Sequence, residues 1–531
     1  MIRLDRKKLL VLYSQRSSHV ATTYEYLSSF GRHSCFDVSY CEAVYGVVPG
    51  FNFEEFDAVI VSYCCCLRAP ALLSGHIVEK LKLFSGVKIL SIQDEYDGIF
   101  WLRQKIKEIK FDFVLTCVPE SHISRVYPPQ EFPGCQFVNV LTGYVPDKYD
   151  LTAYSLPLRE RQTLIGYRGR RIGLAYGRLG YLKLEVGRKF RDACQRLSVP
   201  HDIDWTEDSR IYGEDWFRFL GSCRATLGSE SGSSLFDDED GIRNRVIQLE
   251  KQQPDLEYPG EIQEMLSSIE DTIPMGQISP RIFEAAALRT PMCLIEGKYS
   301  GILKPERNYI NIAPDFSNVE QVINSLSDLN SLQEMADRTY IDIIESQTYS
   351  YRSFVGIVDN LIAQNLGKRP FVHAPTTWQE AKGDLPHPVF VYPTSEPLTR
   401  EHWRQRRTVL RRRVVLASRL QDIPAGEPLL IYGAGAGGKI LRRSLEAVGR
   451  SVAGYLDSYR SGEYDGLPLF HAEKALTKLG DGSVIAVASM YVDDIVSTLL
   501  LAERGFQICD SYPLVSSSQS ELSEKLAVYD L

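Results

Sequence analysis

The stretch Ser279-Pro-Arg-Ile-Phe-Glu-Ala-Ala-Ala-Leu-Arg-Thr-Pro291, which runs directly into Met292-Cys-Leu-Ile295, indicates the fold more clearly than any other part of the chain. Ser279 can cap a helix whose first residue is Pro280, and Pro291 ends that helix. The four apolar residues that follow are typical of a short buried strand. A helix joined to a buried strand in this way predicts an α/β sheet in which the start of the helix points into a cleft.

Three features of this helix suit a nucleotide. Its start presents unpaired backbone N–H groups and a partial positive charge, which both favour a diphosphate. Arg281 adds a planar guanidinium that can donate to phosphate oxygens. Glu284 lies one turn further along and can accept hydrogen bonds from sugar hydroxyls. We therefore expect a phosphate-binding site at this point of the chain.

Further short segments belong to the same pattern. They are Gly166-Tyr-Arg-Gly-Arg170, Arg210-Ile-Tyr-Gly213, Gly228-Ser-Glu-Ser-Gly-Ser233, Tyr299-Ser-Gly301, Pro305 and the run from Tyr309 to Asn318. With the stretch quoted above, they resemble the bacterial glycosyltransferases of the two-domain B type, in particular the spore-maturation (CgeB-like) branch. The resemblance covers roughly the first 365 residues. It implies a donor domain that holds a UDP-, GDP- or dTDP-linked sugar, a polysaccharide, lipid-linked or protein acceptor, and no further required cofactor.

One position departs from this resemblance. Family-4 members of the class carry a second glutamate eight positions before the one that matches Glu284, and this chain has Gly276 there. The retaining chemistry of that family is therefore not carried over to this chain. Inversion and retention of the sugar configuration both stay open.

The candidates for donor binding lie at the expected strand ends and helix starts of the second domain. Basic residues suit the diphosphate, because negative charge develops on it as the sugar departs, and polar residues suit the sugar. The candidates are Arg168, Arg170, Lys183, Glu230, Ser231, Arg281, Glu284, Tyr299, Ser300 and Gly301. Residues 229–233 can equally form a flexible turn between glycines.

The candidates for catalysis are His19, Asp94 and Glu95, which follow apolar runs of the first domain. Side chains in that position face the cleft of a doubly wound sheet. A histidine oriented by a carboxylate can deprotonate an acceptor hydroxyl, and the resemblance implies such a histidine near the first strand. His19 can equally be an ordinary capping or surface residue. Glu120 and His122 are the reserve candidates.

Composition indicates a globular protein, with 44% hydrophobic residues, 24% charged residues and a formal net charge of −8. The negative charge gives no overall attraction to nucleic acid. The chain start runs into a short strand and no apolar stretch of about 18 residues follows, so we expect a cytoplasmic location. We interpret Cys64-Cys-Cys66 as buried thiols and Asp237-Asp-Glu-Asp240 as a solvated loop, and expect no metal site.

Apolar runs alternate with helical stretches up to residue 366, and the pattern restarts near Gln162. This alternation of strands and helices predicts two parallel sheets with covering helices, in domains 1–155 and 156–366. The expected strands are Leu9–Tyr13, Ala58–Tyr63, Lys88–Ile92, Phe113–Cys117, Phe137–Leu141, Ala225–Gly228, Met292–Ile295 and Tyr309–Ile312. The segment Ser331–Leu366 predicts helix that either returns to the first domain or packs as an ordinary helix.

Residues 367–424 are expected to separate these domains from a third. They begin with a stretch rich in Pro, His and Thr, which predicts a linker or a surface strap. Arg400–Arg419 then contains eight arginines beside Trp403, Val414 and Ala417. This pattern predicts a basic amphipathic helix, which is either a solvated face or a contact with the inner face of a membrane.

Residues 425–531 predict a third domain of the Rossmann type. A strand leads into Gly433-Ala-Gly-Ala-Gly-Gly438 and then a helix. Gly433, Gly435 and Gly438 let the backbone approach a pyrophosphate, and Asp457 is placed for a ribose hydroxyl. The domain resembles the small nucleotide-binding domains attached to bacterial sugar-modifying enzymes, which implies a nucleotide, nucleotide-sugar or NAD ligand.

The sequence thus predicts an α/β protein with two Rossmann-like domains of the glycosyltransferase B type facing a cleft, and a third Rossmann-like domain at the C-terminus. Two functions other than glycosyl transfer stay open. One is an NAD-dependent sugar-nucleotide oxidoreductase or epimerase, in which the Gly433 segment holds NAD. The other is a non-catalytic scaffold, which Gly276 favours.

Overall fold

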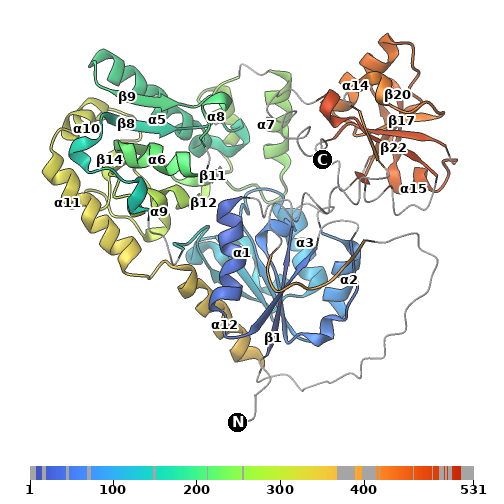
Figure 1. The fold of residues 1–531 in the computed structure, drawn as a ribbon, viewed down its shortest axis with the longest axis horizontal. Coiled ribbons are helices and arrows are strands. Elements are labelled where there is room, and N and C mark those ends of the chain that lie inside the picture. The colour runs from blue at the N-terminus through green and yellow to red at the C-terminus, as the bar shows by residue number, and fades with distance from the viewer. Residues whose placement is uncertain are drawn as a thin grey trace.

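The fold is described here from a computed structural model of the chain. The structure describes residues 7–14, 20–43, 47–67, 73–146, 151–211, 213–253, 256–366, 389–397, 414–417, 419–458, 460–480, 482–489, 495–496, 499 and 505–515. These residues form two lobes joined by a bridging hairpin and a long helix, and a third domain (Figure 1).

The N-terminal lobe is a six-stranded parallel sheet with helices packed on it (lower centre in Figure 1). The strands, in their order across the sheet, are β2 (Asp37–Glu42), β1 (Lys8–Tyr13), β4 (Ala58–Val61), β5 (Val87–Ser91), β6 (Phe113–Thr116) and β7 (Gln136–Asn139). The helices are α1 (Ala21–His33), α2 (Gly75–Leu83), α3 (Ile99–Ile109) and α4 (Ile123–Val126). β1, β4, β5 and β6 are buried almost throughout, which explains why they read as continuous apolar runs.

The second lobe contains a five-stranded parallel sheet (upper left in Figure 1). Its strands, again in order, are β14 (Ile310–Ile312), β13 (Met292–Ile295), β10 (Cys223–Gly228), β8 (Thr163–Arg168) and β9 (His201–Asp204). Its helices are α5 (Gly177–Arg196), α6 (Glu214–Ser222), α9 (Pro280–Ala287), α10 (Val319–Ser325) and α11 (Leu329–Tyr340). The quoted stretch of sequence forms α9 and β13, as predicted.

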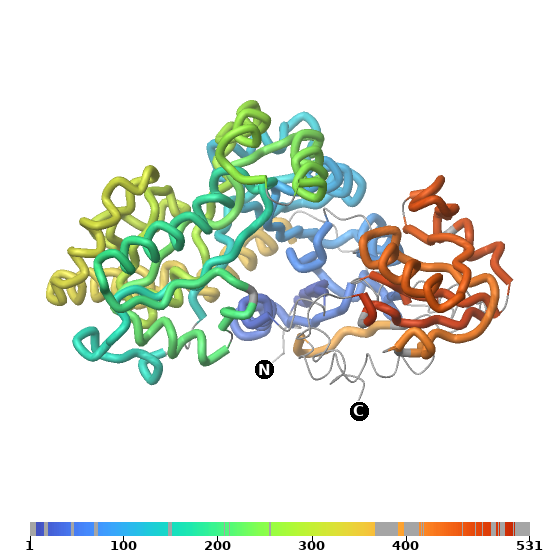
Figure 2. The backbone as a smooth tube through the Cα atoms, turned by 90° about the horizontal axis from the view of Figure 1, so that it is seen from above, coloured from blue at the N-terminus to red at the C-terminus, as the bar shows by residue number. Residues whose placement is uncertain are grey.

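A hairpin of the second lobe completes the core of the N-terminal lobe. It consists of β11 (Ser231–Leu235) and β12 (Glu270–Gln277), and its connection carries α7 (Gly241–Gln252) and α8 (Glu261–Leu266). Phe236, Ile273 and Met275 are at most 4% exposed and belong to the same apolar cluster as β4, β5 and α3. Figure 2 shows the green α7–α8 segment beside the light-blue part of the N-terminal lobe. The two lobes therefore share one hydrophobic core.

A second connection is α12 (Tyr351–Leu366), which leaves the second lobe and lies against α1 (Figure 1). Phe354, Val358 and Ile362 are buried in the N-terminal lobe. Asp359 accepts hydrogen bonds from the Ser34 hydroxyl at 2.8 Å and the Cys35 backbone N–H at 2.7 Å, at the end of α1. The helix thus fastens the end of the second domain to the first.

Beyond α12, a short strap also packs on the N-terminal lobe. β15 (Val389–Val391) pairs in parallel with β3 (Val47–Pro49), and Thr394 forms a bridge with Tyr40. This part of the predicted linker is therefore a surface strap, and residues 367–388 lie outside the described part of the chain.

The third domain is a seven-stranded sheet with Rossmann-type parallel pairing in all but one edge strand (upper right in Figure 1). Its strands, in order, are β16 (Val414–Leu416), β22 (Gln507–Asp510), β21 (Val484–Val487), β17 (Leu429–Tyr432), β18 (Gly454–Asp457), β20 (Leu467–His471) and β19 (Gly462–Tyr464). Its described helices include α14 (Ala436–Ala447) and α15 (Ala472–Leu476). The predicted fold class is confirmed.

The prediction of a basic helix over Arg400–Arg419 is wrong for the C-terminal part of that segment. Val414–Leu416 form β16, which pairs in parallel with β22 at the edge of the third sheet. The β-branched pair Val414-Val415 and the free sheet edge outweigh the helical spacing of the arginines. Residues 400–413 lie outside the described residues, so the membrane contact stays a prediction.

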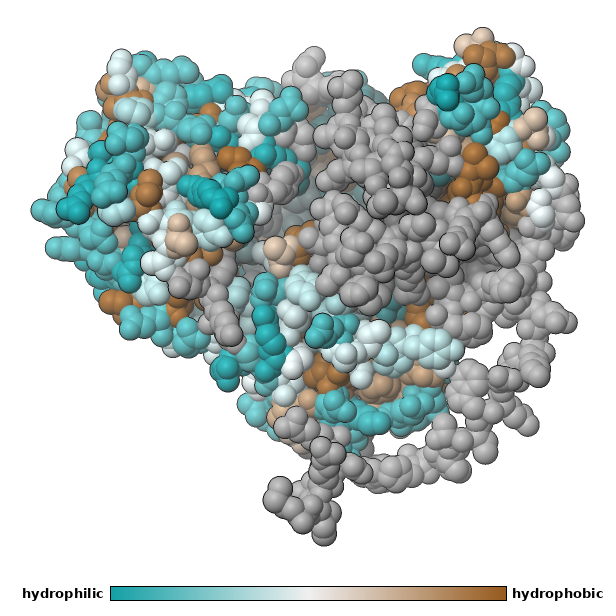
Figure 3. All heavy atoms as spheres, in the orientation of Figure 1, coloured by the Kyte–Doolittle hydropathy of each residue, from teal (hydrophilic) through white to brown (hydrophobic). Residues whose placement is uncertain are grey.

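No helix among the described residues is long and apolar enough to cross a membrane. On the face of the second lobe seen in Figure 3, the described residues are mostly hydrophilic, and hydrophobic ones occur singly or in small groups. Scattered apolar residues of this kind are normal for a protein surface.

Candidate functional site

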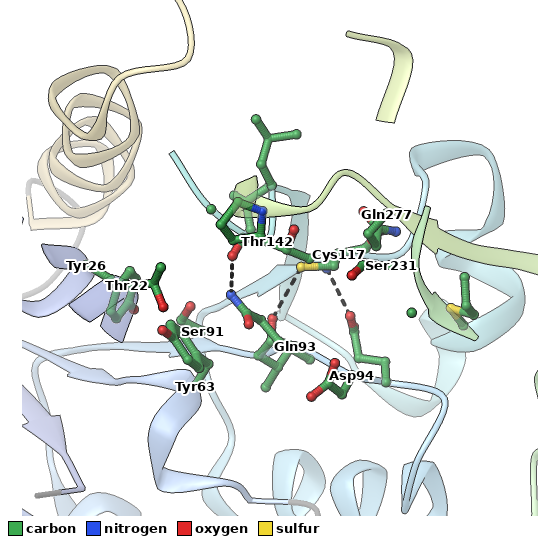
Figure 4. A pocket seen from close by; sticks show the side chains of 18 of the residues that line it. Thr22, Tyr26, Tyr63, Ser91, Gln93, Asp94, Cys117, Thr142, Ser231 and Gln277 are labelled. Atoms are coloured by element: carbon green, nitrogen blue, oxygen red, sulfur yellow. Dashed lines mark hydrogen bonds between the residues drawn. The ribbon is translucent and has the colours of Figure 1, made fainter. Parts of the chain in front are cut away.

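A cavity of about 390 Å³ lies between the two lobes. Its N-terminal wall comes from α1 and the loops after β4, β5 and β7, and its other wall comes from α5, β11 and the start of α9. Figure 4 shows Tyr26 and Tyr63 at one side of this cavity, Ser231 at the other and Asp94 between them. The carboxyl ends of parallel strands meet there, which is where open α/β sheets bind ligands.

Lys183 is the central positive charge of the cavity. It lies on α5, and its ammonium group donates to the Ser231 hydroxyl of β11 at 3.3 Å. Burial, together with the positive charges of Arg281 and Arg170, lowers the pKa of Lys183 to about 8 against the attraction of Asp94. We refer to Lys183, Arg170 and Arg281 as the cationic cluster. An anion placed among them would relieve their repulsion, so the cluster suits a diphosphate.

Asp94 faces this cluster from the N-terminal lobe. It follows β5 with a φ of 58°, in the left-handed region that residues other than glycine rarely adopt. The Tyr96 hydroxyl donates to Asp94 Oδ1 at 2.7 Å, and the Tyr96 carbonyl accepts from the buried Arg243 of α7 at 2.8 Å. Unusual backbone conformations of this kind occur at sites where a side chain has to be held in one direction. The hairpin insertion thus helps to hold the Asp94 carboxylate.

Glu95, the next residue, lies at the back of the cavity and is only 2% exposed. Its carboxylate accepts from the Thr116 hydroxyl, from the Cys117 N–H at 2.9 Å and from the Tyr127 hydroxyl at 2.7 Å. Burial raises the pKa of Glu95 to about 7, although these three donors act in the opposite direction. Of the two predicted carboxylates, Asp94 is therefore the one exposed to the cavity.

The start of α9 lies in the crevice between the lobes, as predicted. Pro280 lines the cavity, and a Cβ added at Gly143 would lie 3.1 Å from its ring. The Thr142 hydroxyl donates to the Ile278 carbonyl at 2.6 Å, which ties this tip to the N-terminal lobe. Ser279 is the N-cap residue, but its side chain makes no capping hydrogen bond, so that detail of the prediction is wrong.

Arg281 and Glu284 are both engaged by Trp216 of α6. The Arg281 guanidinium lies 4.9 Å from the indole ring and donates to the Arg168 carbonyl at 2.7 Å. The Trp216 indole N–H donates to Glu284 Oε2 at 2.7 Å, and burial raises the pKa of Glu284. A small hollow of about 50 Å³ lies beside Trp216, Lys183 and Arg281. A ribose contact to Glu284 stays a prediction.

Arg168 makes structural contacts through its guanidinium. It pairs with Asp202 of β9 at 2.8 Å, donates to the Ser209 carbonyl at 3.0 Å and lies 4.3 Å from the Phe219 ring. Its backbone carbonyl, rather than its side chain, contacts Arg281. The charge of Arg168 is thus matched within the second lobe, whereas Arg170 lines the cavity.

A second, larger cavity of about 990 Å³ adjoins the first, and both are lined by Cys117, Met275 and Gln277. Glu230, Ser300 and Gly301 of the predicted donor set line this second cavity, together with the reserve candidates Glu120 and His122. Arg170, Lys183 and Ser231 line the first. The structure thus divides the predicted donor residues between two neighbouring spaces.

The loop Tyr299–Gly301 has an unusual backbone that other groups hold in place. Tyr299, Ser300 and Gly301 all have positive φ, at 45°, 53° and 76°. Glu230 accepts from the Tyr299 N–H at 2.8 Å, and burial raises the pKa of Glu230. The Ser300 hydroxyl accepts from the Ile278 N–H and donates to Gln277 Oε1, both at 3.1 Å.

Two further details concern the segment just before α9. Gln277 Nε2 donates to the Cys117 carbonyl at 2.7 Å, so Gln277 links the Ser300 loop to the N-terminal lobe. A Cβ added at Gly276 would lie 2.8 Å from Glu230 Oε2. The Glu230 carboxylate therefore occupies the space beside the position where the resembling enzymes carry a glutamate.

In the third domain, the predicted glycines form the expected turn. Gly433 has a φ of 123°, and a Cβ at Gly438 would lie 2.1 Å from the Gly433 carbonyl oxygen. Asp457 ends β18 as predicted, but Arg460 pairs with its carboxylate at 2.7 Å and also donates to the Ala434 carbonyl at 2.6 Å. A cation from the domain itself thus bridges the two halves of the predicted nucleotide site.

His19 lies outside the described residues, so its role as a base stays a prediction. Sequence reasoning did not select Trp216, Tyr96 or Gln277, which act through other predicted residues. Only Gln277 has a sequence signal, because it is a polar residue two positions before the stretch that forms α9. Within the part of the chain that the structure describes, no three His, Cys, Asp or Glu side chains are grouped to hold a metal ion.

No protein-family model matches the chain, and no curated protein matches it. Among solved structures, the chain is similar to an alpha-glucosyltransferase in complex with UDP-glucose and DNA containing an abasic site, at 10% identity and a TM-score of 0.39, over 67% of this chain and 99% of that one. It is similar to an alpha1,3-fucosyltransferase at 9% identity and a TM-score of 0.36, over 68% of this chain and 92% of that one. It is also similar to TarM at 10% identity and a TM-score of 0.34, over 59% of this chain and 55% of the TarM chain. Such distant similarity assigns no substrate to this chain.

The buried Glu95 carboxyl should make stability depend on pH. Because its folded-state pKa is about 7 and the ordinary value is 4.5, the folded state holds this proton more tightly than the unfolded state. The free energy of unfolding should therefore fall as pH rises through this window, by up to about 3 kcal/mol from this group. Urea titrations between pH 4.5 and 7.5 should show a flatter dependence for Glu95→Gln. Tyr127→Phe, which removes a donor to the carboxylate, should steepen it. Equal slopes in all three proteins would contradict the assignment.

Proposed function

We propose that this protein is a glycosyltransferase that moves a sugar from a nucleotide-sugar donor to an acceptor bound against the N-terminal lobe. The observation that carries the proposal is that Lys183 and Arg170 of the cationic cluster line, together with Asp94, a cavity between the lobes, with Arg281 close to Lys183. One side of that cavity suits a leaving diphosphate, and the other offers a carboxylate to an acceptor hydroxyl.

The donor diphosphate would bind at the cationic cluster. Lys183 is held among two guanidinium groups, and a lowered pKa means that its charged form is disfavoured in the empty site. A diphosphate reverses this balance, because its negative oxygens favour the ammonium form and can accept from both lysine and arginine. The nucleotide stays open among UDP, GDP and dTDP.

The transfer step follows from this arrangement. The acceptor oxygen forms a bond to the anomeric carbon, and the bond from that carbon to the diphosphate oxygen breaks and leaves its electron pair on the diphosphate. The acceptor proton passes to the Asp94 carboxylate. The cationic cluster stabilises the charge that develops on the diphosphate. The hydrogen bond from Tyr96 keeps the Asp94 carboxylate oriented. The biological acceptor is proposed to be a bacterial surface glycan, with lipid-linked and protein acceptors as the alternatives.

The charge of Lys183 gives the first test. Titration calorimetry with UDP, GDP and dTDP and their sugars should find a nucleotide that binds more weakly as pH rises from 7 to 9, because Lys183 loses its proton near pH 8. Lys183→Met should weaken that binding roughly 10- to 100-fold at pH 7 and remove the pH dependence.

Lys183→Arg is the matched control, because a guanidinium keeps its charge over this range. It should bind at both pH values with little change between them. Failure of the wild-type protein to bind any of these nucleotides or their sugars would overturn the proposed function.

Asp94 gives the second test. With the donor found above, Asp94→Asn should lower sugar transfer or donor hydrolysis by about 10²- to 10⁴-fold, because the amide cannot take the acceptor proton. The affinity for the nucleotide should be kept. Asp215→Asn, at an exposed position on α6, should have wild-type activity. Full activity in Asp94→Asn would exclude Asp94 as the base and would favour His19 in that role.

The third domain gives the test against an NAD-dependent enzyme. Arg460 already holds the carboxylate of Asp457, which a dinucleotide ribose would need. If the domain is a dinucleotide site, NADH fluorescence titrations of the full chain should show tighter binding to Arg460→Ala than to the wild-type protein. NADH oxidation coupled to a nucleotide sugar would instead favour the oxidoreductase. The domain itself is proposed to bind a nucleotide or a nucleotide sugar without redox chemistry.

A further inference from the structure

The end of the 390 Å³ cavity that is remote from the cationic cluster is lined by aromatic rings. We refer to Tyr26, Tyr63, Tyr144, Tyr351 and Phe354 as the aromatic chamber. These residues come from α1, the turn after β4, the loop after β7 and α12, so the chamber forms only where the returning helix meets the N-terminal lobe. In Figure 4, Tyr26 and Tyr63 lie with Thr22 and Ser91 on the side of the cavity away from Ser231.

The rings of the chamber pack against one another and form a continuous wall. The ring centroids of Tyr26 and Tyr63 are 4.7 Å apart, those of Tyr144 and Phe354 are 4.8 Å apart, and those of Tyr26 and Phe354 are 5.7 Å apart. An extended polypeptide or a lipid chain would need a groove that continues past this end. A compact group suits the cavity better, because its volume of about 390 Å³ is near the lower limit for small-ligand sites.

One hydroxyl group in this wall lacks a good partner. Tyr26 is 5% exposed, and its hydroxyl makes no hydrogen bond of good geometry to a described residue, although Ser91 lies near it. The Tyr63 and Tyr351 hydroxyls, in contrast, donate to the Thr23 hydroxyl at 3.1 Å and to the Thr22 carbonyl at 3.4 Å. A buried polar atom without a partner is costly, so it points to a ligand that supplies one.

The side chains that form the chamber are also neutral. Among the described residues, the charged ones that line the cavity are Asp94, Glu95, Arg170 and Lys183, and none of them belongs to the chamber. Burial raises the pKa of Tyr26 well above its ordinary value, so its hydroxyl stays uncharged. A phosphate-bearing acceptor would need a cation at this end. The polar groups beside the rings are hydroxyls and the Gln93 amide, which donates to the Thr142 carbonyl at 2.9 Å.

We propose that the aromatic chamber binds one uncharged sugar residue of a glycan acceptor and offers one of its hydroxyls to Asp94. This proposal rests on the proposed glycosyl transfer, and it narrows the acceptor class to a saccharide. The faces of a sugar ring are apolar C–H surfaces that pack on aromatic rings, and its rim of hydroxyls both donates and accepts, which matches the Tyr26, Ser91 and Gln93 side chains.

The test uses the full chain with the nucleotide identified above at saturating concentration. Saturation-transfer NMR measures binding of methyl glycosides of glucose, galactose and N-acetylglucosamine, and compares them with glycerol phosphate, decyl phosphate and a serine- and threonine-containing peptide. At least one glycoside should bind, and the phosphates and the peptide should not compete with it. Tyr26→Phe should weaken glycoside binding roughly tenfold and leave nucleotide affinity unchanged.

Tyr309→Phe is the matched control. Its hydroxyl is also buried without a good partner among the described residues, but it lines neither cavity, so glycoside binding should not change. Neither substitution removes a hydrogen bond of good geometry within the described structure, so both variants should fold. Binding of no glycoside, binding that Tyr26→Phe leaves intact, or displacement of a glycoside by the peptide or a phosphate would each overturn the chamber proposal. In all three cases normal nucleotide binding would leave the glycosyltransferase proposal standing.

Discussion

The arrangement of the site depends on the hydrophobic core that the two lobes share. Phe236, Ile273 and Met275 enter the N-terminal lobe from the β11–β12 hairpin, and α12 closes the other side of that lobe. Burying three such side chains is worth several kcal/mol, which is comparable with the whole stability of a typical domain. The lobes are therefore held face to face by packing as well as by covalent connection, and the distance between their strand ends is fixed by the same contacts.

This constraint explains how a poorly matched set of charges can persist. Lys183 is buried beside two guanidinium groups of its own lobe, and separation of the lobes would expose it to water. The core, together with Gln277 and Thr142, which bond across the boundary, opposes that separation. The result is a site whose electrostatic free energy is improved by an anion, and for a buried group such as Lys183 such an interaction is stronger than at the surface. Asp94, held by Tyr96 and a strained backbone, supplies only part of the missing negative charge.

Most of the sheet architecture could be predicted because buried parallel strands are continuous apolar runs. β13 matches its expected bounds, and the start of α9 lies in the crevice as the Pro280 pattern indicated. The bridging hairpin was missed because Ser231–Leu235 is mostly small and polar, and its strand character comes from pairing with β12 and from the other lobe. Two features depend on contacts between distant segments, which local sequence spacing does not reveal. They are the division of the donor residues between two cavities and the hydrogen bond from Trp216 to Glu284.

The glycine at position 276 is better understood from the structure than from the sequence. In the sequence, Gly276 stands where the resembling enzymes carry a glutamate, and the missing carboxylate favours a non-catalytic scaffold. In space, Glu230 fills the region that a side chain at 276 would enter, and it holds the left-handed Tyr299–Gly301 loop through a backbone hydrogen bond. Ser300 of that loop continues through Gln277 to the Cys117 carbonyl. A Cβ at 276 would lie 2.8 Å from Glu230 Oε2, so the end of the Glu230 side chain would have to shift to admit it. Glu230 thus supplies an acidic group to the second cavity and is linked through the Ser300 loop and Gln277 to the N-terminal lobe.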